Sequence, residues 1–288
     1  LVWVDDNYGY MKRVSNPAEQ KRSGHSGVYY HLSYLGAPHD YLWLNTTPPV
    51  LMYEELMKAY RMGADRYWLL NVGDIKPMEL GMKTFFDLAW NVDEFDVKSI
   101  NLHQSQFLGS LFGKSYAPRL QRILDTYYRL AWSRKPEFMG WEREWDSKEY
   151  TGLKDTEYSF QNYSEAQRRL RDYEQISNDV RALLNELPYR QRASFFEMVA
   201  FPVMASSQMT RKFLMAQLNH EEFKLGNVKE ANWAARQSRQ AFDSIASLNK
   251  KYNAMLDGKW NGMMDLAPGW CALYQKMPEV NYTEGADE

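Results

Sequence analysis

The sequence contains very little cysteine and no long apolar run. Its 288 residues include one cysteine, Cys271, which excludes an intramolecular disulfide and any metal site built from several thiolates. A lone cysteine is more often a small buried side chain than a nucleophile, so we assign Cys271 no chemistry. No apolar stretch approaches the roughly 20 residues that a membrane-spanning helix needs. We therefore expect no membrane span and no multi-cysteine metal centre.

The chain also lacks a strong charge of either sign. Its formal net charge is −2, and Lys and Arg are spread along the sequence instead of forming blocks. Such a chain exerts no long-range attraction on a nucleic acid or an anionic membrane. The sequence has no HExxH motif, no glycine-rich phosphate loop and no G-x-S-x-G turn. We predict no metal, no cofactor and no nucleic-acid partner.

Aromatic residues, in contrast, are abundant, and the sequence starts abruptly. Phe, Trp and Tyr make up 15% of the chain. Core packing accounts for many of them, although carbohydrate sites also use aromatic faces to contact the C–H patches of sugar rings. The first residues, "LVWV", lie inside an apolar run with no Met and no leader-like segment before it. The sequence therefore predicts a segment of a longer protein.

Residues 1–100 alternate between strand-like and helix-like patterns. The strand-like runs are "LVWVDD", "GVYYHLSYLG", "DYLWLNTTPP" and "RYWLLNVGD", and the helix-like runs are "VLMYEELMKAYRMGA" and "PMELGMKTFFDLAWNV". Thr47 is a candidate cap for the first of these helices, and Gly63 is a candidate stop. Repeated steps from strand to helix are typical of a parallel sheet with crossover helices. Because a complete eight-stranded barrel needs about 250 residues, we expect the last β/α units of a TIM-like barrel.

The remainder of the chain is predicted to be helical. Residues 101–158 indicate a helical connection followed by an irregular excursion. In residues 159–288, apolar side chains recur at spacings of three and four, with Pro188 ending one run and Pro202 placed to kink the next. Long helices joined by short turns are typical of an antiparallel bundle. The predicted fold class is therefore α/β followed by all-α.

Polar side chains gather where the predicted strands end. The first strand is followed by Asp5, Asp6 and Asn7, the second ends near His31 and Tyr34, and the last of the region is followed by Asn71 and Asp74. Side chains at the carboxyl ends of parallel barrel strands face the active site.

Each of these residues also has a plainer interpretation. The acids and amides suit turns or helix caps, and His31 suits a hydrogen-bonded core histidine. Trp43 is a candidate sugar platform, although core packing is the commoner explanation for such a tryptophan. Acids with neutral polar helpers and no cofactor motif suit acid–base hydrolysis, as in glycosidases that use two carboxyl groups.

Four motifs together carry a family resemblance. "WVDDNYGY", "GVYYHLSYLG", "DYLWLNTTPP" and "RYWLLNVGDIKP", in this order, resemble the glycoside hydrolase family 115 α-glucuronidases, and "RKPE" and "YNAMLDGKWNGMM" resemble the helical domain that follows their barrel. The resemblance implies inverting removal of glucuronic acid or its 4-O-methyl form from glucuronoxylan, without a metal. It also implies that Asp5 and Asn71 are active-site residues.

The resemblance implies a division of roles, and other readings stay open. Catalytic roles are expected for Asp5, Asn71 and Asp6, and substrate-binding roles for His31, Tyr34, Asn7, Asp74 and Trp43. A second carboxylate and a uronate-binding Arg are expected upstream of Leu1. The alternatives are a uronic acid of arabinogalactan or pectin, or a non-catalytic carbohydrate-binding segment. The polysaccharide substrate implies secretion or a periplasmic location, and a homodimer is one possible assembly.

Overall fold

The computed structural model describes residues 1–36, 39–141, 153–265 and 275–285. Cys271 falls outside the described residues. The chain forms two compact units, Leu1–Trp132 and Ser133–Glu288. The predicted divisions near residues 100 and 158 follow changes of sequence pattern, whereas these two units follow the packing of the chain.

The first unit is built on a small parallel sheet. Its strands are β1 (Val2–Val4), β2 (Gly27–His31) and β3 (Tyr67–Asn71), arranged in the order β1-β2-β3. Val2 pairs with Gly27, and His31 pairs with Asn71. The carboxyl ends of β2 and β3 therefore lie in register, and β1 ends beside them.

The strand expected from "DYLWLNTTPP" does not form. This segment makes one isolated antiparallel bridge, between Tyr34 and Tyr41, and then continues as a buried loop through Thr46. Pro48 and Pro49, which have no N–H to donate to a strand ladder, follow this run immediately. Its apolar side chains, among them Tyr41, Trp43 and Leu44, are buried in the loop instead of in a strand.

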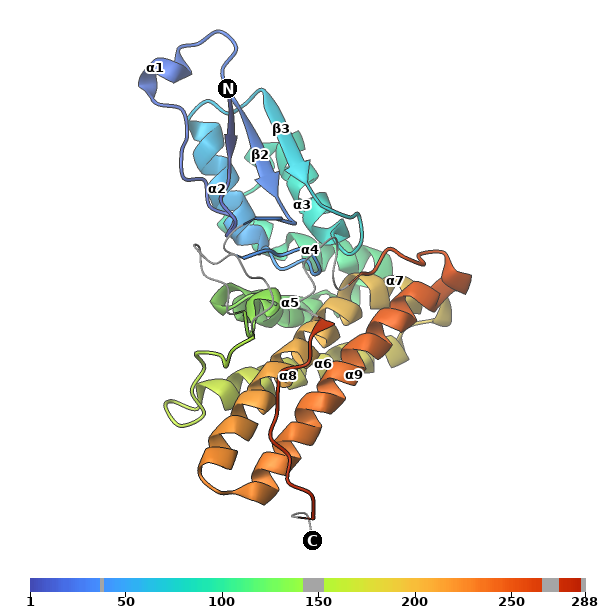
Figure 1. Ribbon diagram of the computed structural model, residues 1–288. Coiled ribbons are helices and arrows are strands. Elements are labelled where there is room, and N and C mark those ends of the chain that lie inside the picture. The colour runs from blue at the N-terminus through green and yellow to red at the C-terminus, as the bar shows by residue number, and fades with distance from the viewer. Residues whose placement is uncertain (37–38, 142–152, 266–274, 286–288) are drawn as a thin grey trace. The chain divides into compact units, whose positions relative to one another are not determined.

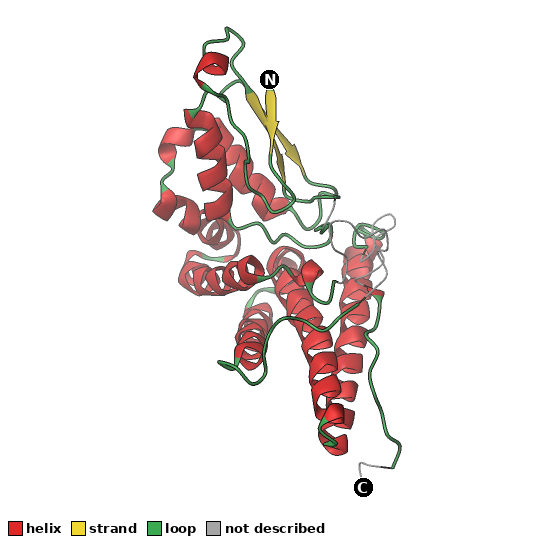
Figure 2. Cartoon of the chain, turned by 60° about the vertical axis from the view of Figure 1, so that its left-hand side comes forward, coloured by secondary structure: helices red, strands yellow, loops and turns green. Residues whose placement is uncertain are grey.

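Helices cover one face of the sheet, as Figure 2 shows. The helices of the first unit are α1 (Pro17–Gln20), α2 (Pro49–Arg61), α3 (Glu79–Trp90), η1 (Val92–Glu94), α4 (Val97–Phe112), η2 (Lys114–Tyr116) and α5 (Ala117–Ser133), and α2, α3 and α4 form the layer on the sheet. Val28 and Tyr30 of β2 are fully buried against Leu56, Phe85 and Ile100 of this layer. Alternation along β2 consequently turns Tyr29 and His31 toward the opposite face.

The helix predicted to follow Pro49 is confirmed as α2, but its cap differs from the prediction. The N-cap residue is Pro48, and no side chain accepts a hydrogen bond there, so Thr47 is not the cap. Thr47 is only 1% exposed because it belongs to the buried loop. At the other end, Gly63 has a φ of +89°, the left-handed conformation that glycine adopts without strain.

The second unit is helical. Its elements are η3 (Pro136–Phe138), α6 (Glu165–Glu186), α7 (Tyr189–Phe195), the π-helical turn η4 (Phe196–Ala200), α8 (Phe201–Lys224) and α9 (Val228–Gly258). Figure 1 shows α8 and α9 side by side, joined by a short turn at which Gly226 has a φ of +79°. Pro202 lies in the first turn of α8, directly after the π-helical turn, because proline has no N–H to continue the preceding ladder.

Candidate functional site

Asp5 and His31 form a closely bonded pair at the carboxyl ends of β1 and β2. The Oδ1 atom of Asp5 lies 2.6 Å from Nδ1 of His31, and the backbone N–H of His31 donates to Oδ2 of Asp5 at 3.3 Å. Asp5 immediately follows β1, and its own N–H donates to the carbonyl of Tyr29 at 3.4 Å. Both carboxylate oxygens are therefore held by one neighbouring residue.

Burial sets the electrostatics of this pair. The Asp5 side chain is 0% exposed, whereas 9% of the His31 side chain remains exposed. Desolvation raises the pKa of the Asp5 carboxyl, and the hydrogen bonds and charge of His31 partly oppose that rise. Nε2 of His31 has no hydrogen-bond partner in the part of the chain that the structure describes. Asp5 is thus enclosed, and Nε2 of His31 is the atom of the pair that remains available to bind a ligand or exchange a proton.

Tyr29, Tyr34 and Asn71 surround the imidazole. The ring centroids of Tyr29 and Tyr34 lie 4.4 Å and 4.7 Å from that of His31. Nδ2 of Asn71 donates to the hydroxyl of Tyr29 at 2.6 Å, and its Oδ1 accepts from the backbone N–H of Gly73 at 3.0 Å. We call Asp5, Tyr29, His31, Tyr34 and Asn71 the strand-edge cluster.

Asp6 and Asn7 act in the turn after β1. Oδ1 of Asp6 accepts from the N–H groups of Tyr8 and Tyr10 at 2.9 and 3.0 Å, and its Oδ2 lies 3.1 Å from Nζ of Lys12. Nδ2 of Asn7 donates to the carbonyl of His39 at 3.1 Å, and Asn7 is 6% exposed. These contacts favour the turn interpretation for both residues, because the polar atoms involved are already bonded.

Trp43 is buried and Asp74 is exposed. Trp43 is 1% exposed and is one of the largest fully buried side chains, so it has no face to offer a sugar ring. Its burial assigns Trp43 to the core instead of a platform. Asp74 is exposed in the loop after β3, and it makes no hydrogen bond or ion pair with any described residue.

The comparisons with known proteins name the family. The family model "Glycosyl hydrolase family 115" matches residues 1–138, the part of the chain that contains the strand-edge cluster. Residues 1–138 belong to glycosyl hydrolase family 115. The comparison with curated proteins found no match.

A solved structure of a family member resembles the whole chain. It is described as a novel family GH115 4-O-methyl-α-glucuronidase, BtGH115A, with specificity for decorated arabinogalactans. The two share 38% sequence identity with a TM-score of 0.85, over 100% of this chain and 36% of that one. The chain therefore spans about a third of the length of this family 115 relative, and its likeness to that structure extends beyond residue 138.

Sequence reasoning missed Tyr29, which links Asn71 to His31. The hydroxyl of Tyr29 accepts from Asn71, and its ring packs against the imidazole. The signal was present in "GVYYH", because residues two apart on a strand share a face. It also missed Glu55 of α2, a buried carboxylate whose Oε2 accepts from the N–H of Met11 at 2.6 Å and lies 2.5 Å from Nζ of Lys58.

Arg13 and Lys76, two cations in loops of the first unit, are paired with acids. Nη2 of Arg13 lies 2.8 Å from Glu19, and Nζ of Lys76 lies 2.5 Å from Glu79. Among the residues described, no group of three or more His, Cys, Asp and Glu could hold a metal ion. No helix within the described ranges is long and apolar enough to cross a bilayer.

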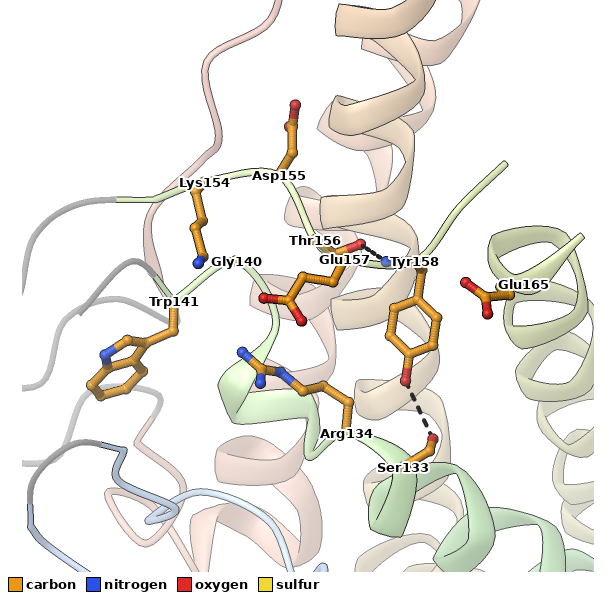
Figure 3. A pocket seen from close by; sticks show the side chains of 10 residues that line it. All are labelled: Ser133, Arg134, Gly140, Trp141, Lys154, Asp155, Thr156, Glu157, Tyr158 and Glu165. Atoms are coloured by element: carbon orange, nitrogen blue, oxygen red, sulfur yellow. Dashed lines mark hydrogen bonds between the residues drawn. The ribbon is translucent and has the colours of Figure 1, made fainter. Parts of the chain in front are cut away.

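A separate cavity of about 330 Å³ lies in the helical unit (Figure 3). Arg134 and Glu157 extend into it, and the hydroxyl of Tyr158 lies 3.3 Å from Oγ of Ser133. Arg169, 3% exposed, donates to both of these hydroxyl oxygens at 3.0 and 3.1 Å. This cavity shares no residue with the strand-edge cluster, and its lining falls mostly in the stretch that the sequence left without a regular pattern.

Proposed function

We propose that the chain contributes part of the active site of an inverting α-glucuronidase that removes glucuronic acid or its 4-O-methyl form from glucuronoxylan. The observation that supports this most directly is the buried Asp5–His31 pair at the carboxyl edge of a parallel sheet, within the stretch that belongs to family 115. Perturbed acid–base groups at such an edge are typical of catalytic sites.

In the proposed mechanism, Asp5 acts through His31. The carboxylate accepts the Nδ1 proton of the imidazole, which orients the ring and leaves Nε2 able to take or give a proton. An inverting glycosidase needs one group that activates water and one that protonates the leaving oxygen. We assign the first role to the Asp5–His31 pair, and we place the acid outside this chain.

Asn71 and Tyr34 are proposed to position the sugar. Asn71 is held by Tyr29 and Gly73, so its amide is fixed at the end of β3 beside the imidazole. Tyr34 is half-buried with its ring against His31, and its hydroxyl can bond a sugar hydroxyl. Asp6 and Asn7 support this arrangement by fixing the turn after β1, and Asp74 is kept as a proposed contact to substrate.

The sheet is proposed to be the last part of a TIM-like barrel. The face opposite the helices carries Val2, Val4, Tyr67 and Leu69, which are 41–54% exposed. The strands of such barrels are buried on both faces and apolar on both, so this exposed apolar face fits the inside of a barrel. A barrel would bring further strand ends to the strand-edge cluster.

A second candidate substrate is the uronic acid of a decorated arabinogalactan. It is favoured by the description of the family 115 relative that shares 38% identity with this chain. Either polysaccharide is met outside the cytoplasm, so we also propose secretion or a periplasmic location. Assembly as a homodimer stays a prediction.

The test uses the complete protein and two defined substrates. Oligosaccharides of glucuronoxylan and of glucuronidated arabinogalactan are incubated with it, and the released uronic acid is followed by proton NMR from the first turnover. We expect release from glucuronoxylan, with the β-anomer appearing first. Release from arabinogalactan alone would favour the second substrate. Appearance of the α-anomer first would contradict inversion. No release from either substrate would favour a non-catalytic carbohydrate-binding role.

A further inference from the structure

A polar groove of about 320 Å³ lies on the helical unit, between α6, α8 and α9. Its lining shares no residue with the strand-edge cluster or with the cavity of Figure 3. The polar side chains that line it come from all three helices and include Glu174, Ser177, Arg181, Gln208, Arg211 and Gln240. The groove is therefore lined mainly by hydrogen-bonding side chains.

Each of the two arginines of the groove is bonded to a neutral amide. Nη1 of Arg181 donates to Oδ1 of Asn178 at 3.0 Å, and Nη2 of Arg211 donates to Oε1 of Gln237 at 2.5 Å. Both partners are neutral amides, and neither guanidinium forms an ion pair within the described ranges. The amides orient each guanidinium and leave its charge and most of its donors available to a ligand.

Ser177 supplies a second, independent sign of a ligand. It is 1% exposed, it lines the groove, and its Oγ has no hydrogen-bond partner in the described part of the chain. A buried hydroxyl that makes no hydrogen bond costs free energy unless something supplies a partner. A polar ligand in the groove would supply one.

The remaining side chains restrict the chemistry of that ligand. The carboxylate of Glu174 lines the same groove and makes no hydrogen bond or ion pair with the described residues, so it repels a compact, multiply charged anion. A carboxylate is, however, a good acceptor for sugar hydroxyls, and the amides of Gln208 and Gln240 can both donate and accept. One anionic group beside several hydroxyls suits this set better than a bare anion.

We propose that this groove binds a uronic acid residue of a glycan, with its carboxylate between Arg181 and Arg211 and its hydroxyls on Glu174, Ser177 and the two glutamines. The choice of a uronate over another hydroxylated carboxylate rests on the proposed function. The groove would hold an acidic side branch of the polysaccharide without hydrolysing it.

The test is a calorimetric or NMR titration of the chain with sodium D-glucuronate. The variants are Arg181→Gln and Arg211→Gln, and the matched control is Arg168→Gln, an exposed arginine of α6 outside the groove. We expect each groove variant to weaken binding by about tenfold or more, the typical effect of losing a charge-assisted hydrogen bond, and the control to bind like the parent chain. Arg181 is exposed, so its variant stays informative if Arg211→Gln fails to fold.

Two further titrations separate the possible outcomes. D-glucose tests the need for the carboxylate, and inorganic phosphate tests whether any anion suffices; equal binding of either would overturn the proposal.

The Asp5→Asn variant, titrated with glucuronate, tests whether binding is independent of the strand-edge cluster. Glucuronate binding that persists in Asp5→Asn and is lost in Arg181→Gln supports the groove even if no glycosidase activity is found. Binding lost only in Asp5→Asn would overturn it.

Discussion

At the scale of single residues, Lys212 of α8 shows the effect of burial most clearly. Its side chain is 0% exposed, its Nζ donates to the carbonyl of Lys276 at 3.0 Å, and burial lowers its pKa to about 7. In the unfolded chain the same amine titrates near 10.5. Between those two pH values the unfolded state binds more protons than the folded state, so stability rises with pH.

The first prediction concerns that pH dependence. The free energy of unfolding should rise less steeply between pH 7 and pH 10.5 in Lys212→Met than in the parent chain. Lys212 contributes up to about 1.4 kcal/mol per pH unit to that rise. Urea denaturation at several pH values measures the slope. The exposed Lys250→Met is the control and should keep the parent slope. An unchanged slope in Lys212→Met would show that this amine is not the source.

The residues of the strand-edge cluster could be found from the sequence only in part. The sequence identifies four of its five members, because each ends or follows a strand-like run: Asp5, His31, Tyr34 and Asn71. Their mutual contacts depend on strand register, which no single run encodes, so the pairing of Asp5 with His31 and the link through Tyr29 could not be predicted. Trp43 was ambiguous because an aromatic residue in an apolar run has the same pattern in a core and in a binding face.

At the scale of elements, two asparagines hold the extended segment near the end of the chain against the helices. Nδ2 of Asn219 donates to the carbonyl of Asn281 at 2.8 Å, and Oδ1 of Asn219 accepts from the N–H of Asn281 at 2.7 Å. Asn232 makes the same two bonds with Thr283, at 2.8 and 3.0 Å. Each side-chain amide thus makes, with one residue of the segment, the two backbone hydrogen bonds that a neighbouring strand would otherwise make.

The second prediction tests this contact. Asn219 is 0% exposed and also donates to the carbonyl of Ala231 at 2.7 Å, so Asn219→Ala leaves buried backbone groups without partners. We expect a loss of about 2–3 kcal/mol in the free energy of unfolding. Urea denaturation measures the loss, with the exposed Asn185→Ala of α6 as control. Faster hydrogen exchange at the Asn281 amide should accompany it; equal stability in both variants would contradict the role.

Helical elements followed from the sequence more closely than strands did. α2, α6 and α9 carry apolar residues at helical spacing, which is a local signal that the sequence shows directly, whereas α8 is buried on almost every side and lacks such a one-sided pattern. The run at residues 41–47 has a strand-like composition, but it packs as a buried loop and joins neither outer edge of the three-stranded sheet. That information is not local, so the sequence could not provide it.

At the scale of the whole molecule, the uncovered face of the sheet has a measurable consequence. Val4 and Leu69 are 51% and 41% exposed on that face. We expect this chain by itself to bind a hydrophobic dye such as ANS there, and the double variant Val4→Thr, Leu69→Thr to bind several-fold less. Val97→Thr, an equally exposed valine at the start of α4, is the control. Dye fluorescence that is the same in all three proteins would place the apolar binding surface elsewhere.

The central claim is that Asp5 and His31 work as one acid–base unit, and the turnover of the complete protein tests it most directly. The chain offers a matched control, because His25 and Asp65 form a similar pair, 2.8 Å apart, at the amino ends of β2 and β3. We predict that Asp5→Asn and His31→Ala each lower kcat on a glucuronidated substrate by about a hundredfold or more, that the double variant is no slower than the worse single one, and that Asp65→Asn keeps parental kcat. A correctly folded Asp5→Asn enzyme with parental kcat would contradict the account.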